Sequence, residues 1–485
     1  MTSQHGYGAV LRVREFRFVF AAHVLSLLGA VVSHVALPVL VYAQTASPLM
    51  SALTFGLGFM PQALGGALLA PVAERLRARP VLIGCDLVCA VSVAGMAVPG
   101  MPLAALLVLR AVTAFVQPLF GGVRAAGLGE FLKGDAFVLG RSLIRISAQG
   151  AQIAGFAATG LLLVVLPPRG ALLTTVAGFL ASATLLRVGT ADRPAAVRDP
   201  AADGARTGAG GGGRGGIRAV GTRARGSVAP GTRALFADRR IRALILLNWL
   251  PPAFLVVPEG LAAPYSEEIG AGPAGVGLLL AAMPVGGVAA ELAAGALLKP
   301  PARERLVLPL ACCLLLPFLL FAWRPGLPLA LAGLLLAGSG IAYTLGLDRW
   351  FFDAVPEELR ARAMTVMTAG LMTVQGVGMA AGGAAAEFMA PHWAIVAAGA
   401  AGTVCVTAAV HAVYAARAPR PAPAATIAPA VRDLPAATPA PPAPSEPPAP
   451  HAPPAPPAPA VPAVPDTDRR ESAEGPVPET PMGDM

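Results

Sequence analysis

The sequence is poor in charge: only 13% of its 485 residues are Asp, Glu, Lys or Arg, against roughly 25% in an ordinary soluble chain. It also has few aromatic residues, at 6%, and just five cysteines. This excludes a charge-covered soluble protein and a disulfide-rich secreted domain. Apolar residues make up 55% of the chain, and its mean hydropathy is +0.66. They fall in runs of about twenty, long enough for a helix to cross a bilayer core of roughly 30 Å.

Twelve apolar runs are candidates for membrane-spanning helices. The first six cover residues 18–42, 50–72, 81–99, 102–123, 143–166 and 169–187, and the second six cover residues 241–262, 273–298, 306–323, 327–347, 364–388 and 391–415. Continuous runs indicate helices, since the strands of a membrane barrel would alternate apolar and polar residues. We therefore predict an all-α polytopic membrane protein with twelve transmembrane helices in two six-helix halves.

Two segments lack the composition of a folded core. Residues 188–240 include the run GAGGGGRGG among arginines, and residues 417–485 are rich in proline and alanine. Neither segment has enough apolar surface to fold, so we predict a flexible linker and a disordered tail. The linker could touch anionic lipid, and the tail could recruit a protein partner, although both could equally be plain solvated extensions. The remaining parts are an N-terminal tail and two bundles, at residues 1–17, 18–187 and 241–416.

The arginines predict how the chain is oriented. They gather in the loops that follow the even-numbered spans, whereas the opposite loops hold only Arg169 and Arg324. Cytoplasmic loops of membrane proteins are enriched in Lys and Arg. We therefore predict a multi-pass protein of the cell membrane with both termini, the linker and the tail in the cytoplasm.

Four stretches resemble a known transporter family. They are FRFVFAAHVLSLLGAVVSHVALPVLVYAQTASPL (16–49), GGALLAPVAERLRARPVLIGCDL (65–87), VPEELRARAM (355–364) and VQGVGMAAGG (374–383). In content and order they are similar to the major facilitator superfamily, in its bacterial drug- and metabolite-efflux branch. The resemblance covers about residues 16–187 and 238–416. It implies two six-helix bundles that rock about a shared cavity.

The resemblance also implies a cytoplasmic gate. The loop after the second span contains Glu74, Arg75 and Arg79, which match the family's motif of an acid and arginines, with Glu in place of the usual Asp. A carboxylate beside arginines can bridge to the N-terminus of a neighbouring helix, whose dipole favours an anion. The motif therefore implies a latch that breaks during transport. The alternative is a topology determinant that keeps this loop inside.

Charged residues within the spans are the candidates for proton coupling, because a charge at mid-membrane costs roughly 2.5–3.5 kcal/mol even on insertion scales. Glu291 is the first candidate for a protonatable carboxylate, unless it reaches water or Lys299 at the cytoplasmic end. Arg110 resembles the family's fourth-span arginine, which is linked to proton transfer; it could also hold an anionic substrate or satisfy polar groups between helices. Asp86 is the third candidate, or else part of the charge network of the gate motif.

The family fold implies that the first, fourth, seventh and tenth spans line the cavity. Beside Arg110, the polar and aromatic candidates on these spans are His34, Gln117, Asn248, Trp249 and Tyr343. His23 and His34 share a face of the first span, since eleven residues make almost three helical turns. They could handle protons or simply pack between helices. A largely apolar cavity with a few such groups suits bulky apolar ligands.

Together these features predict a secondary active transporter that exports small amphiphilic or hydrophobic compounds, a drug or secondary metabolite, by proton antiport. Two departures bear on the antiport: Ala30 follows Gly29 where related pumps often have an acid, and Phe156 follows Gly155 where antiporters tend to have proline. One alternative is an uptake permease for a nutrient or organic anion, and another is a non-transporting membrane scaffold. The expected partners are a small-molecule substrate, protons and membrane lipid, with no nucleic acid. The sequence shows no nucleophile–base pair, zinc-binding helix or phosphate-binding loop, so we predict no enzyme activity, cofactor or metal.

Overall fold

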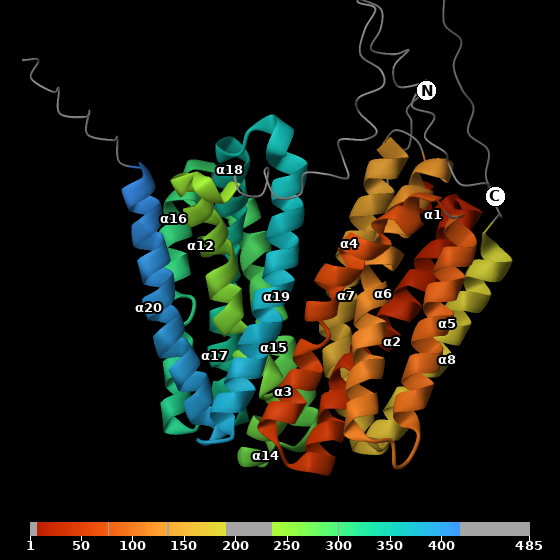
Figure 1. Ribbon diagram of the computed structural model, residues 1–485, viewed down its shortest axis with the longest axis horizontal. Helices are drawn as coiled ribbons and strands as arrows, with labels where there is room; N and C mark the ends of the chain where they lie inside the picture. The colour runs from red at the N-terminus through yellow and green to blue at the C-terminus, as the bar shows by residue number, and fades with distance from the viewer. Residues whose placement is uncertain (1–6, 76, 133–134, 191–234, 299, 418–485) are drawn as a thin grey trace, which may run out of the picture. The chain divides into compact units, whose positions relative to one another are not determined.

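The computed structural model describes residues 7–75, 77–132, 135–190, 235–298 and 300–417. The predicted tail, most of the predicted linker and Lys299 lie outside these residues. Every regular element of the described part is a helix (Figure 1). The described residues belong to one unit, Met1–Pro419.

The elements follow the chain in two sets. The first set is α1 (Tyr7–Arg12), α2 (Arg14–Thr45), α3 (Pro48–Gly56), α4 (Met60–Arg75), α5 (Ala78–Ala97), α6 (Leu103–Phe131), α7 (Asp135–Val165) and α8 (Pro168–Gly189). The second set is α12 (Arg239–Leu255), α13 (Val257–Gly260), α14 (Ala262–Glu268), α15 (Gly272–Leu297), α16 (Pro300–Cys313), the 3₁₀ helix η1 (Leu316–Trp323), α17 (Leu327–Ser339), η2 (Gly340–Tyr343), α18 (Thr344–Ala354), η3 (Glu357–Leu359), α19 (Arg360–Ala386) and α20 (Pro391–Arg417).

Twelve helical segments of the described part are long and apolar enough to cross a membrane, from Arg14–Thr45 to Pro391–Ala415. The prediction of an all-α polytopic membrane protein with twelve spans is confirmed. The largest difference lies in the tenth span, which continues to Ala354 where the apolar run predicted an end at residue 347. The reason is that α18 stays helical after the apolar run ends, with one buried face.

Of the spans that are not continuous α-helices, two break near glycine or proline. The second span breaks between α3 and α4, where Gly58 donates to the Phe55 carbonyl at 2.8 Å instead of to that of Thr54. The seventh span breaks between α12 and α13 at Val256, after Pro251 and Pro252. Proline has no N–H group for the helix ladder, and glycine loses more conformational entropy in a helix than other residues do. In transporters, broken spans often supply the polar backbone groups of a site.

The two sets of six spans contact each other closely through glycine. α7 crosses α15 where a Cβ atom on Gly160 would lie only 2.8 Å from the Gly277 Cα. α3 crosses α19, which lies beside it in Figure 1, where a Cβ atom on Gly56 would lie 3.0 Å from the Gly376 carbonyl oxygen. Small residues let helix backbones approach this closely in lipid. Both crossings lie toward the end of the spans that carries the loops at residues 46–47, 166–167 and 387–390, which the arginine distribution predicts to be the outer end.

Candidate functional site

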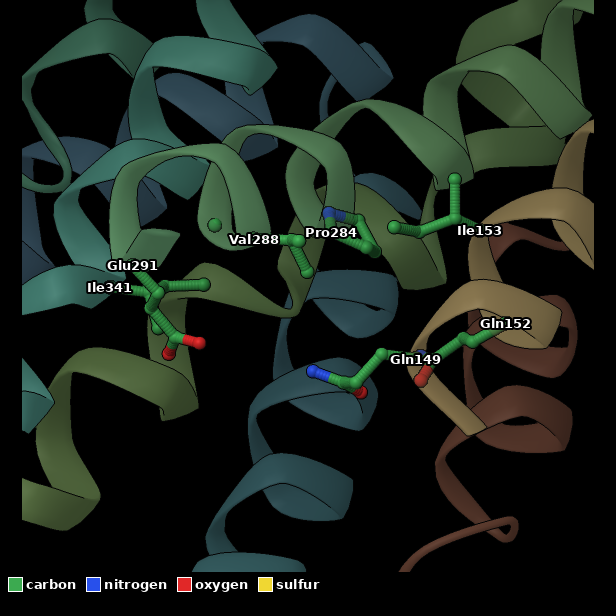
Figure 2. Close-up of a pocket in the computed structure, with 8 residues that line it drawn as sticks. Gln149, Gln152, Ile153, Pro284, Val288, Glu291 and Ile341 are labelled. Atoms are coloured by element: carbon green, nitrogen blue, oxygen red, sulfur yellow. The ribbon is translucent and has the colours of Figure 1, made fainter. Parts of the chain in front are cut away.

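A cavity of about 80 Å³ lies between α7 and α15, and so between the two sets of spans. It is lined by Gln149, Gln152, Ile153, Pro284, Gly287, Val288, Glu291 and Ile341. Figure 2 shows Glu291 on α15 and the two glutamine side chains on α7 arranged around this cavity. A carboxylate and two amides therefore meet where one half faces the other.

Glu291 occupies an otherwise apolar helix. It is half-buried and is the single ionisable residue of α15. It lies fourteen residues beyond Gly277, which is about 21 Å along the helix at 1.5 Å per residue. The close crossing and the carboxylate thus sit near opposite ends of one helix. A rocking motion about the crossing would change what surrounds the carboxylate.

Arg110 lies in the break of the second span. Its Nε donates to the Thr54 carbonyl oxygen at 3.4 Å, the acceptor that the break leaves without its usual helical donor. Gly58 gives the guanidinium room, because a Cβ atom there would lie 2.0 Å from Nη2. Arg110 is only 2% exposed, and its Nη2 has no hydrogen-bond partner among the described residues. The arginine thus serves as a cap for α3, while part of its guanidinium is left without a partner.

Asp86 is completely buried between three helices. Its Oδ1 accepts a hydrogen bond from the Ser26 hydroxyl at 3.0 Å, and its Oδ2 accepts one from the Ser182 hydroxyl at 2.7 Å. The alternative expectation is that Asp86 joins the charges of the gate motif. Of those charges, the Arg79 side chain donates to the Arg187 carbonyl. The hydroxyls come from α2 and α8, so the carboxylate holds α5 against both of them.

The proposed cavity-lining residues fall into different surroundings. Gln117 lines a cavity inside the first set of spans, and His34 meets the Phe55 ring edge-on with centroids 6.2 Å apart. Trp249 donates through Nε1 to the Met367 carbonyl at 2.9 Å, and the buried Tyr343 donates to the Leu247 carbonyl at 3.4 Å. Asn248 is half-buried. The described cavities do not bring these five residues into one site.

The gate motif is described in part. Glu74 and Arg75 end α4, and their side chains lie outside the described residues. Arg79 lies at the start of α5 and caps the end of α8 through the Arg187 carbonyl. Arg303 likewise caps α15, donating to the carbonyls of Ala294 at 3.1 Å and Gly295 at 2.7 Å. The arginines that predict the cytoplasmic end therefore also satisfy carbonyls at the C-termini of helices, where a positive charge is favourable.

At the predicted outer end, Glu387 links the two sets of spans. Its Oε1 accepts from the Leu49 backbone N–H at 3.0 Å and from the Ser47 hydroxyl. Ser47 is the N-cap of α3 and also accepts from the Met50 N–H, at 3.1 Å. A carboxylate at a helix N-terminus is stabilised by the helix dipole. Glu387 from the second set thus caps a helix of the first.

Glu268 makes a similar contact at a helix N-terminus, but within the second set of spans. Glu268 accepts from the His392 backbone N–H at 3.2 Å and pairs with the His392 ring, while the Arg324 Nε lies 3.4 Å from its Oε1. Burial raises the pKa of the neighbouring Tyr265 well above its usual value, with a smaller contribution from the charge of Glu268. The Tyr265 hydroxyl therefore stays protonated and donates to the Pro325 carbonyl at 2.8 Å.

We expect Glu387→Gln to open the predicted outer end. The amide keeps an acceptor oxygen but loses the charge that favours the α3 N-terminus, so the ratio of closed to open molecules at this end should fall by about fivefold, as for a cap worth ~1 kcal/mol. Distances between spin labels on the loops at residues 98–102 and 324–326 would report the change. Glu268→Gln is the control, because it alters a cap within one set. An equal change in both variants would contradict the role of Glu387.

Sequence reasoning missed several of these residues. Ser26, Ser182 and Glu387 gave no signal, because a serine in an apolar run and an acid at a span end are common. Arg124, a buried arginine that lines the same cavity as Gln117, could have been found. It follows Arg110 and Gln117 at intervals of seven residues, which places the three on one face of a helix.

Comparisons with known proteins bear on the fold. No family model matches the sequence, and no curated protein matches it. Among solved structures, the chain is similar to the nucleoside transporter NupG, with a TM-score of 0.63 and 16% identity over 81% of this chain and 98% of that one. It is similar to the POT family transporter PepTSo, with a TM-score of 0.62 and 11% identity over 83% and 98%.

A third similar structure is a bacterial homologue of the human lysosomal transporter Spinster in an inward-facing, unoccupied conformation. Its TM-score is 0.52, with 14% identity over 84% of this chain and 96% of that one. At these identities the likeness concerns the fold. The chain shares its all-helical fold with these solved transporters, and its described part has twelve helical segments long and apolar enough to cross a membrane.

Proposed function

We propose that this chain is a proton-coupled secondary active transporter that exports small amphiphilic compounds across the cell membrane by alternating access. The fold supports a transporter, because it is shared with transporters of nucleosides and of the POT family. The single observation that carries the coupling is the position of Glu291 in a cavity between the two sets of spans.

The coupling follows from geometry. The glycine crossing near the predicted outer end holds α7 and α15 together, whereas Glu291 and the two glutamines lie beside a cavity on the same pair of helices. When the halves rock, the helices separate at the crossing and approach each other at the cavity. This would exchange water around Glu291 for protein and so alter its proton affinity. A carboxylate whose protonation depends on the conformation couples proton flow to transport.

The gate residues complete the proposal. Glu74, Arg75 and Arg79 form the cytoplasmic latch, and Glu387, which follows α19 and caps α3, forms its counterpart at the outer end. Arg110 and Asp86 remain secondary coupling candidates inside the first set of spans. His34, Gln117, Asn248, Trp249 and Tyr343 remain the proposed lining of the substrate path, a role in which Trp249 and Tyr343 would also hold neighbouring backbone in place.

Uptake is the second candidate function, and the comparisons support uptake as much as they support export. The similar structures include a nucleoside transporter and a POT family transporter in complex with 5-aminolevulinic acid, a small polar compound. A permease of this kind would use the same fold and the same carboxylate, with proton and substrate moving in the same direction.

The direction of coupling is the test. Proteoliposomes holding the full-length chain are loaded with a fluorescent amphiphile, and a pH gradient of either sign is imposed. We expect the amphiphile to move against its own gradient toward the acidic side, since antiport exchanges it for protons. Movement toward the alkaline side would establish symport and the uptake alternative, and movement that ignores the pH gradient would contradict proton coupling.

A further inference from the structure

Three polar side chains form a line along α6. Arg110, Gln117 and Arg124 are seven residues apart, which places them on one face over about 21 Å of helix. Both arginines are buried, with exposed fractions of 2% and 8%. Neither guanidinium forms an ion pair with any residue of the described part. Two buried positive charges that contact no carboxylate are costly in a membrane protein and mark a candidate functional site.

Each arginine lies close to a histidine of α2. Arg110 is near enough to His34 for their charges to interact, and Arg124 donates to Nδ1 of His23. A guanidinium has N–H donors and no acceptor, so this contact requires the neutral form of His23. The histidine therefore does not neutralise Arg124, although it contacts one of its nitrogen atoms.

The nearest acid does not contact Arg124 directly. Asp86 is close enough to Arg124 for an electrostatic interaction, but its two oxygens accept from Ser26 and Ser182. The face of the Arg124 guanidinium lies 4.2 Å from the centroid of the Phe120 ring, which holds it in place without pairing its charge. The cation is thus fixed, desolvated and open to an external anion.

A cavity of about 180 Å³ lies beside this cation. Its polar lining residues are Arg124, Gln117, Ser26 and His23. Most of the remaining lining is apolar or aromatic and includes Leu27, Val116 and Phe179. An engineered apolar cavity of about 150 Å³ admits benzene. The space therefore suits a ring or short chain that carries one acidic group.

We propose that this cavity is the site of an organic anion, whose carboxylate or phosphate pairs with Arg124 and whose apolar body contacts Leu27, Val116 and Phe179. The proposal rests on the function proposed above and narrows the amphiphilic substrate to an anionic one. Arginine is suited to this role because its planar fork binds both oxygens of a carboxylate. Gln117 supplies a further donor, and Arg110 places a second positive charge on the same helix face.

Binding can be tested without transport. The purified full-length chain is heated with benzoate, with its neutral analogue benzamide, or with the cation benzylammonium, and the unfolding midpoint is followed as a function of concentration. A ligand of the folded state raises this midpoint. We expect the shift in the unfolding midpoint to be half-saturated at a benzoate concentration about tenfold lower than the benzamide concentration that does the same. Benzylammonium should have no effect.

Variants assign the effect to the cavity. Arg124→Gln should abolish the preference for benzoate, and Arg124→Lys, which keeps the charge and the fold but lacks the fork, should retain part of it. Arg242→Gln is the matched control, since the substitution removes the same charge from an exposed position on α12. The Arg242 guanidinium donates to the Phe236 carbonyl at 3.3 Å. This variant should bind benzoate as the unaltered chain does.

Several results would overturn the inference. Equal binding of benzoate and benzamide, the absence of any benzoate effect, or a benzoate preference that survives in both Arg124 variants would each exclude an anion site at Arg124. Failure of the proposed function looks different: benzoate would bind as expected, while proteoliposomes would show no proton-driven movement of the amphiphile.

Discussion

Glu291→Gln is expected to abolish proton-driven accumulation while leaving downhill movement of the substrate nearly intact. The amide has the size of the carboxylate and can still form hydrogen bonds, but it cannot take up or release a proton. Loss of a positioned proton-transfer group should lower the rate of uphill transport by about 100-fold. The measurement is amphiphile accumulation in proteoliposomes under an imposed pH gradient, beside efflux without a gradient.

The control for this variant is another acid of the same set of spans. Glu304 on α16 is partly exposed and lies 3.1 Å from Arg349, so Glu304→Gln removes a carboxylate outside the interface cavity. It should accumulate the amphiphile at the normal rate, because exposed ion pairs of this kind contribute little. If Glu291→Gln accumulates substrate as well as Glu304→Gln does, Glu291 is not the coupling residue.

Gly277→Val is expected to arrest the transport cycle by preventing closure at the predicted outer end. A Cβ atom at this position would lie 2.6 Å from both the Gly160 Cα and the Phe156 carbonyl oxygen, which are backbone atoms that cannot turn aside. Overpacking of this kind costs about 1–3 kcal/mol. The ratio of closed to open molecules should therefore fall by roughly 5- to 150-fold, and turnover should fall with it.

The same helix offers the control for this change. A Cβ atom on Gly295 would meet nothing within 4 Å, so Gly295→Val adds the same side chain to α15 without a clash. Spin-label distances across the predicted outer end should lengthen in Gly277→Val and stay unchanged in Gly295→Val. Normal transport by Gly277→Val would show that the close crossing of α7 and α15 is not needed for the cycle.

The expected partners of Asp86 show where sequence reasoning reached its limit. Because Asp86 lies near the start of a span, the sequence predicts that it interacts with the charges of the neighbouring loop, which are close in sequence. The structure instead surrounds it with serines that are 60 and 96 residues away, on α2 and α8. Glu291 shows the same limit, since its place in an otherwise apolar span marked it as unusual, whereas Gln149 and Gln152 became relevant only when α7 packed against α15.

The sequence by itself determined that the chain has twelve helices able to cross a membrane and, apart from the end of the tenth, where each one lies to within about five residues. It could do so because the transfer of some twenty contiguous side chains into lipid is a local free energy that adds up along the chain. The tertiary structure decided which polar groups share a cavity, which glycines lie where helices cross and which buried arginines contact no carboxylate. Those relations depend on how helices distant in sequence pack against one another, and a run of hydropathy carries no information about its neighbour in space.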